Sequence, residues 1–451
     1  MPTPPSPPRS TAFRQQMPEI AEAQALLAAL AESEEVKAAA AQRQRRGQLQ
    51  VAYGNALIAA RGFGAPETIE AFAKARESAY GEKDAPELFA ADWGLYSGHY
   101  QRGELAQARE YAKTLLRNVA DRPDSPEAGV AQRAVGVTHW FAGEYREARD
   151  HLKRGLALFQ PGRDDDLAFR FGWDAGVGAT LHLALTLWPM GDVGRAVSLV
   201  RAAQTRTAAL SHIGTHAHGN MYAALFELMR GGLSHPAPNA IEVARIARER
   251  DLPMWQAWGG FLEGVATAEG RAPGEGLTDM RRGVELLREQ NVLIFDGLIK
   301  IALAEAEARA GDVDRALAIL DEALATAERI GHRAFEAELH RVRGDMLLKR
   351  DPSNPAPAEK AFRTAIAVAR RQATRSASNS ARRRRWRSSI NPQRGRPKPT
   401  PFSRLRSKVF RQHRKCRRSA KRGRCLQRSP LVLTTRPRCS ATSGVRHGDA
   451  L

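Results

Sequence analysis

A glycine that recurs roughly every 40 residues, with an alanine five positions after it, most constrains how this chain can fold. The clear copies are Gly103 with Ala108, Gly143 with Ala148, Gly191 with Ala196, and Gly311 with Ala316. Degenerate copies fall near Gly62, Gly231 and Gly270. Glycine can end a helix in the left-handed conformation, and the acid that often follows it suits the first turn of a new helix. The alanine is small enough for two helices to cross closely, so each mark predicts the turn of a helix hairpin.

The segments on both sides of each mark have a helical period. After Gly311, apolar residues from Val313 to Ala327 recur at helical spacing along one face. The segments before the marks are apolar on more sides, as in 131–142 and 294–310, which is typical of the inner helix of a solenoid. One hairpin cannot bury its own apolar face, so neighbouring hairpins must stack. The sequence predicts an all-α, right-handed α-solenoid of about eight hairpins over residues 17–374.

The mark resembles the tetratricopeptide repeat, with Gly136 seven positions before Gly143, although the spacing here exceeds the usual ~34 residues. The stretches 183–191, 337–352 and 357–372 are similar to the C-terminal helical array of bacterial signalling proteins with class III adenylate/guanylate cyclase and ATPase modules. That resemblance implies a sensory or partner-binding region that regulates such enzymes. Neither module is expected within this sequence.

No motif of a catalytic or cofactor site is found in the sequence. It has no Gly-x-x-x-x-Gly-Lys-[Ser/Thr] loop for phosphates, no Gly-x-Ser-x-Gly elbow and no His-Glu-x-x-His pair. We therefore expect a non-catalytic scaffold without a cofactor or metal, which binds another protein in its concave groove. The tryptophans of the first helices are candidates for contact with a partner, and packing is the alternative that we favour for them. These groove candidates are Trp93, Trp140, Trp255 and Trp258.

Two polar clusters invite a metal interpretation. His212, His216 and His218 place two imidazoles one helical turn apart, as a zinc site would, but no acid or cysteine lies close enough to complete a tetrahedron. Asp164, Asp165 and Asp166 could bind a hard cation, although acids before a helix more often cap it. In both cases the structural interpretation is the stronger one.

The formal net charge of +21 is concentrated at the C-terminal end. Residues 375–451 hold 24 Lys and Arg against one acid, Asp449, and all three cysteines, so the repeat array is nearly neutral. We expect residues 1–16 and 375–451 to be disordered. We also expect a cytoplasmic protein, because the sequence shows no signal peptide and no long apolar run, and the array has no cysteine. The basic segment has three interpretations: a nucleic-acid-binding arm, an arm for acidic membranes, or translation in a shifted reading frame, which would explain why it interrupts a repeat. The residues that could contact a polyanion are Arg382, Arg383, Arg384, Arg385, Trp386 and Arg387.

Overall fold

The computed structural model describes residues 40–79, 86–231, 238–270 and 272–374, and these residues form helices joined by short connections. Seventeen helices lie in the described part of the chain, and it contains no strand. In chain order they are α3 (Ala40–Arg61), α4 (Pro66–Ser78), α5 (Pro86–Gln101), α6 (Leu105–Arg117), α7 (Pro126–Phe141), α8 (Tyr145–Leu158), α9 (Leu167–Phe171), α10 (Ala175–Leu187), α11 (Val193–Ala209), α12 (Ile213–Gly231), α13 (Pro238–Glu249), α14 (Pro253–Glu269), α15 (Pro273–Glu289), α16 (Asp296–Arg309), α17 (Val313–Ile330), α18 (Glu336–Arg350) and α19 (Ala356–Thr374). The predicted all-α class is confirmed. The predicted disordered ends, including Arg382–Arg387, lie outside the described residues.

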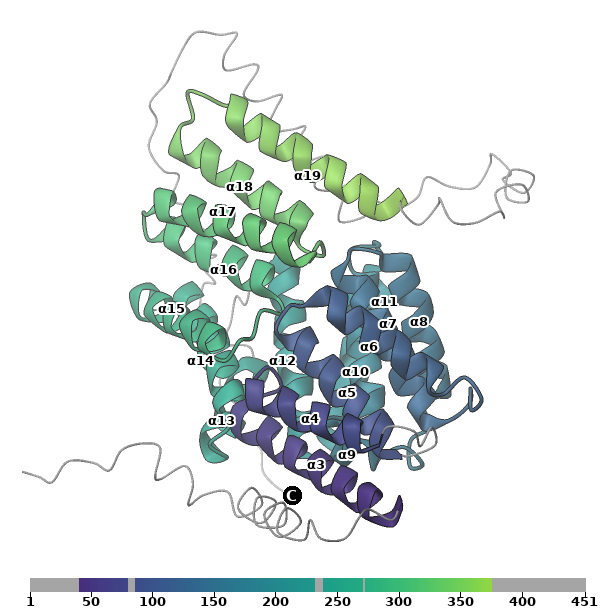
Figure 1. Cartoon of the computed structure of the whole chain (residues 1–451). Helices are drawn as coiled ribbons and strands as arrows, with labels where there is room; N and C mark the ends of the chain where they lie inside the picture. Colours follow the sequence, from purple (N-terminus) through teal and green to yellow (C-terminus); the bar gives the residue numbers. More distant parts are fainter. Residues whose placement is uncertain (1–39, 80–85, 232–237, 271, 375–451) are drawn as a thin grey trace, which may run out of the picture.

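Sixteen of the helices pack as eight successive pairs, from α3 with α4 to α18 with α19, and the short α9 lies between the third and fourth pairs. Figure 1 shows the pairs following one another in chain order, from α3 and α4 to α18 and α19. The first helix of a pair is buried on most sides, whereas the second is strongly amphipathic. The pairs therefore stack as a solenoid, with the first helices inside.

The repeated glycines end helices in the left-handed region. Gly103, Gly143, Gly191 and Gly311 have φ between +71° and +103°. Each is followed by an acid at the N-cap of the next helix, and the alanine five positions on is fully buried. At Gly136 a Cβ atom would lie 2.8 Å from Leu152, so the crossing of α7 and α8 is close enough to need glycine.

In two neighbouring repeats the acid of the mark also binds the histidine five positions before it. Glu104 lies 2.5 Å from Nδ1 of His99, and Glu144 lies 2.6 Å from Nδ1 of His139. The bond to His139 and the charge of Arg109 lower the pKa of Glu144. The acid therefore ties the end of one helix to the start of the next, in addition to lying near the helix dipole.

The superhelix closes on itself after five pairs. The amide of Leu293, which follows α15, donates to the carbonyl of Gln101 at 2.8 Å, and the amide of Arg333, which follows α17, donates to the carbonyl of Phe141 at 2.7 Å. The Tyr145 hydroxyl donates to the carbonyl of Ala334 at 2.9 Å. The second and third pairs thus bond directly to the region of the sixth to eighth pairs, so the array is more compact than an open solenoid.

One local expectation was wrong. Gly270 ends α14 with φ −97° rather than in the left-handed region, so it does not share the conformation of the other helix-ending glycines. At the C-terminal end of the described array, Phe362 is buried against α18, where Gly344 leaves room for its ring, and Ile366 is half-buried.

Candidate binding site in the interior of the superhelix

The centre of the superhelix is filled by aromatic rings from successive inner helices. Phe295, just before α16, is fully buried and lies 5.4 to 5.6 Å from the rings of Trp140, Phe141 and Tyr222. Its backbone has φ 60° and ψ 9°, the left-handed region that a phenylalanine rarely adopts. The packing around the ring therefore holds a backbone conformation that the residue alone would not choose.

The four tryptophans predicted as groove candidates belong to this interior. Trp93, Trp140, Trp255 and Trp258 are each 8% exposed or less. Their burial agrees with the packing role that we favoured from the sequence. Contact with a ligand stays a prediction, and it requires the ligand to enter the interior.

A single positive charge lies among the rings at the end of the interior formed by α5, α7 and α10. Arg133 of α7 is only 4% exposed. Its guanidinium carbon is 5.1 Å from the ring centre of Trp93 and 5.4 Å from that of Trp173, which precedes α10. The two indoles meet at 66°, so the guanidinium occupies the corner between them. On a third side, a Cβ atom at Gly178 would lie 3.4 Å from the guanidinium carbon.

Two buried histidines complete this site. His218 of α12 stacks on Trp173 with ring centres 4.6 Å apart, and His182 of α10 donates through Nδ1 to the carbonyl of Gly178 at 2.8 Å. Nε2 of His182 and Nδ1 of His218 are fully covered and have no hydrogen-bond partner among the described residues. Burial, and then the charge of Arg133, lowers the pKa of His182 to about 3, and the same causes lower the pKa of His218 well below its usual value.

We define these five residues, Arg133, Trp93, Trp173, His182 and His218, as the arginine cage. Sequence reasoning missed Arg133. The available signal was its place in a helix that is apolar on most sides, between Val130 and Val137, where a surface arginine is not expected.

The three-histidine cluster does not converge on a metal site. Nδ1 of His212 accepts from the amide of Thr215 at 3.1 Å and so caps α12, while His216 bonds the carbonyl of Leu210 at 2.6 Å. His218 points to the arginine cage instead. Among the described residues no group of three His, Cys, Asp or Glu side chains is arranged to hold a metal ion.

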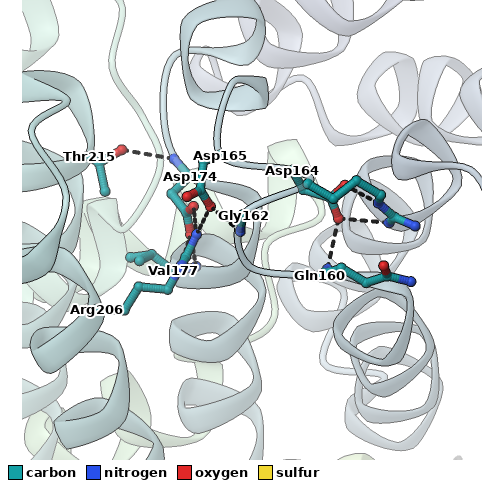
Figure 2. Close-up of polar contacts among 9 residues, drawn as sticks. Gln160, Gly162, Asp164, Asp165, Asp174, Val177, Arg206 and Thr215 are labelled. Atoms are coloured by element: carbon teal, nitrogen blue, oxygen red, sulfur yellow. Dashed lines mark hydrogen bonds and ion pairs between the residues drawn. The ribbon is translucent and has the colours of Figure 1, made fainter.

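Two of the three aspartates, Asp164 and Asp165, have separate partners in the protein, as Figure 2 shows. Asp164 accepts from Arg163 and from the amide of Gln160, while Asp165 accepts from Arg206 at 2.7 Å. Asp166 is the N-cap of α9, without a side-chain bond to it.

Arg206 also binds Asp174, which is fully buried (Figure 2). Asp174 caps α10 by accepting from the amide of Val177 at 2.7 Å, and its own amide donates to Thr215 at 2.9 Å. This network fixes the connection between α8 and α10 to α11 and α12, which is a structural role.

A match to a known protein family agrees with the repeat architecture of one part of the chain. The tetratricopeptide repeat family matches residues 87–160, which comprise α5 to α8. An uncharacterized protein of Rhizobium meliloti (strain 1021) is 23% identical over 280 residues, which cover 62% of this chain. The chain spans about a quarter of the length of that relative, since the match covers 27% of it.

A solved structure with similarity to the chain is a Rap protein complexed with competence and sporulation factor, at 10% identity and a TM-score of 0.35. The alignment covers 92% of this chain and 98% of the Rap protein. No helix in the described ranges is both long and apolar enough to cross a membrane. The chain is thus a helical-repeat protein in which residues 87–160, from α5 to α8, match the tetratricopeptide repeat family.

Proposed function

We propose that this chain is a non-catalytic scaffold that binds a partner protein, or senses a ligand, in a bacterial signalling system of the cyclase type in the cytoplasm. The observation that carries the proposal is the stack of eight helix pairs with a tetratricopeptide match at its start. Stacked helix pairs present a long surface with regular spacing, which suits the binding of proteins and peptides. The much longer relative supports a repeat region that works beside other modules.

A surface for the partner is suggested by α9. Phe169 is 70% exposed, and its ring is held edge-on against His212 at 4.9 Å. An exposed aromatic ring held in one orientation is a common anchor of protein interfaces. We therefore propose that the partner contacts α9, beside the network of Asp174 and Arg206.

Site-specific photo-cross-linking tests this proposal. The amino acid p-benzoylphenylalanine replaces Phe169 in cells that produce the full chain, and cross-linked proteins are identified by mass spectrometry. The matched control places the same residue at Arg146, which is exposed on α8. We expect a cyclase or a cyclase-associated ATPase to be cross-linked at Phe169 and not at Arg146. Equal, nonspecific cross-linking at both positions would contradict the proposal, as would turnover of ATP or GTP by the purified chain.

A second candidate function rests on the basic residues 375–451, which could bind nucleic acid. The test compares the full chain with a chain that ends after Arg371 in oligonucleotide binding over a salt series. Binding that is steep in salt and lost on truncation supports the basic arm. Salt-steep binding that the shortened chain retains would contradict both the arm and the scaffold proposal. The coding DNA through codons 370–380 and the intact mass of the native protein test the shifted reading frame.

A further inference from the structure

The arginine cage differs from the other buried charges of this protein. The buried carboxylates of Asp92 and Glu307 face Arg76 and Arg281 respectively, and Asp174 faces Arg206. The Arg133 side chain has no ion pair and no hydrogen bond with any described residue; the rings of Trp93 and Trp173 are its neighbours. A buried charge without a partner is costly, and the attraction to two rings offsets only part of the cost. An anion beside the guanidinium group would balance this charge.

Space reaches the guanidinium group. Its nitrogens make no hydrogen bond, yet they are not among the fully covered polar atoms without a partner. They therefore border space that a water-sized molecule can occupy. Gly178 packs directly against this group, because a Cβ atom there would lie 3.3 Å from the Trp173 ring and 3.4 Å from the guanidinium carbon. Glycine inside a helix costs roughly 1 kcal/mol relative to alanine, so α10 gives up stability at the position that faces the cage.

The chemistry of the cage selects among anions. A guanidinium group presents its N–H donors in a planar fork that matches the two oxygens of a carboxylate. Arg133 supplies one positive charge, and the two histidines are neutral at pH 7 because burial lowers the pKa of each. A monoanion is balanced there, whereas a doubly charged phosphate is not. The walls beside the charge are indole and imidazole rings, which favour an apolar or aromatic body on the ligand.

We propose that the arginine cage binds the carboxylate of a small apolar or aromatic acid, or of a peptide C-terminus, with Arg133 as its counter-ion. The ligand's carboxylate accepts from the Arg133 N–H groups, and its apolar body lies against Trp93 and Trp173. This inference deepens the proposed sensory role and rests on it for its biological use. Binding itself needs no partner protein, so the two proposals can fail separately.

Calorimetry with the purified full chain tests the cage. The probes are 3-phenylpropionate with its amide as the uncharged match, and the peptide Ala-Ala-Phe with a free or an amidated C-terminus. The variants are Arg133→Gln, which removes the charge, and Arg133→Lys, which keeps the charge but loses the fork. Arg146→Gln is the matched control, because it removes one exposed arginine from the neighbouring helix α8.

We expect at least one free carboxylate to bind and both amides to bind far more weakly. Arg133→Gln weakens binding by about tenfold to a hundredfold, since a hydrogen-bonded ion pair is lost, while Arg146→Gln leaves it unchanged. A stronger signal from the peptide than from 3-phenylpropionate identifies a chain terminus as the source of the carboxylate, and the reverse identifies a small acid.

Three results would overturn the proposal: no binding of either carboxylate, equal binding of acid and amide, or unchanged binding by Arg133→Gln. Far-UV circular dichroism checks that each variant is folded. If Arg133→Gln does not fold, Arg133→Lys decides. A loss of affinity in Arg133→Lys supports bidentate recognition, and an unchanged affinity contradicts it.

Discussion

Replacement of Arg206 by alanine leaves the buried carboxylate of Asp174 without its counter-ion. In the folded chain Arg206 donates to Asp174 at 2.9 Å from Nε and at 2.6 Å from Nη2, and Asp174 is 0% exposed. The carboxylate would keep only the amide of Val177 as a donor. Removal of one partner of a buried ion pair typically costs about 3–5 kcal/mol, because the other charge stays buried.

The lower half of that range applies here. The Arg206 side chain is 22% exposed, so water can reach part of the space that it leaves. Its second bond, to the more exposed Asp165, adds little. We therefore expect Arg206→Ala to lower the free energy of unfolding by about 3 kcal/mol. Asp174→Ala should cost less, about 1–2 kcal/mol, because it loses a helix cap while Arg206 keeps Asp165 and turns to solvent.

Urea unfolding followed by far-UV circular dichroism measures both changes, with Arg245→Ala as the control. Arg245 binds Glu242 and Glu249 on the exposed face of α13, so its loss should change the midpoint little. An Arg206→Ala variant within about 1 kcal/mol of the wild type would refute the reasoning. An Asp174→Ala variant less stable than Arg206→Ala would refute it too, since the order depends on which charge stays buried.

Three further perturbations follow from the packing. Burial lowers the pKa of His332 to about 4, so the unfolded chain binds the proton first on acidification. The lowered pKa contributes stability that is fully present above pH ~6.5 and is lost as the pH falls towards 4. Between pH 7 and pH 5, we expect the free energy of unfolding of His332→Asn to fall by about 2 kcal/mol less than that of the wild type, as measured by urea unfolding. In thermal melts, Gly276→Ala should destabilise the chain by about 1–3 kcal/mol, because its Cβ atom would lie 2.2 Å from the amide nitrogen of Ala268. Gly274→Ala is the control: no atom packs within 4 Å of its Cβ position, so it should stabilise the chain by up to about 1 kcal/mol. Phe295→Ala should cost about 3–5 kcal/mol by the same melts, and a loss below 1 kcal/mol would mean that the central ring is not packed as described.

The helix pairs could be predicted from the sequence because their signals are local. A left-handed residue that ends a helix selects glycine, as at Gly103 and Gly311, and the apolar period of the next helix follows within a few residues. Gly270 shows the limit of this signal, since a glycine after a helix can also take an ordinary φ.

The interior could not be predicted, because it depends on curvature that no short segment encodes. The bond between Leu293 and Gln101 exists only because five pairs complete one superhelical turn. The left-handed conformation of Phe295 has no signal in its side chain. Arg133 stands out as an arginine in a helix that is apolar on most sides, but only the fold shows that it lies between Trp93 and Trp173.

The closure of the superhelix has a consequence for how the chain reaches its native state. Open repeat arrays make contacts only between neighbours, so they can fold from any point and tolerate the loss of an end pair. Here the Tyr145 hydroxyl meets the Ala334 carbonyl across 189 positions of sequence. Such contacts raise the relative contact order, and the chain must lose the entropy of closing a long loop before they form. The array should fold more slowly than its helical content suggests, and it should lose stability as one unit when either end is removed.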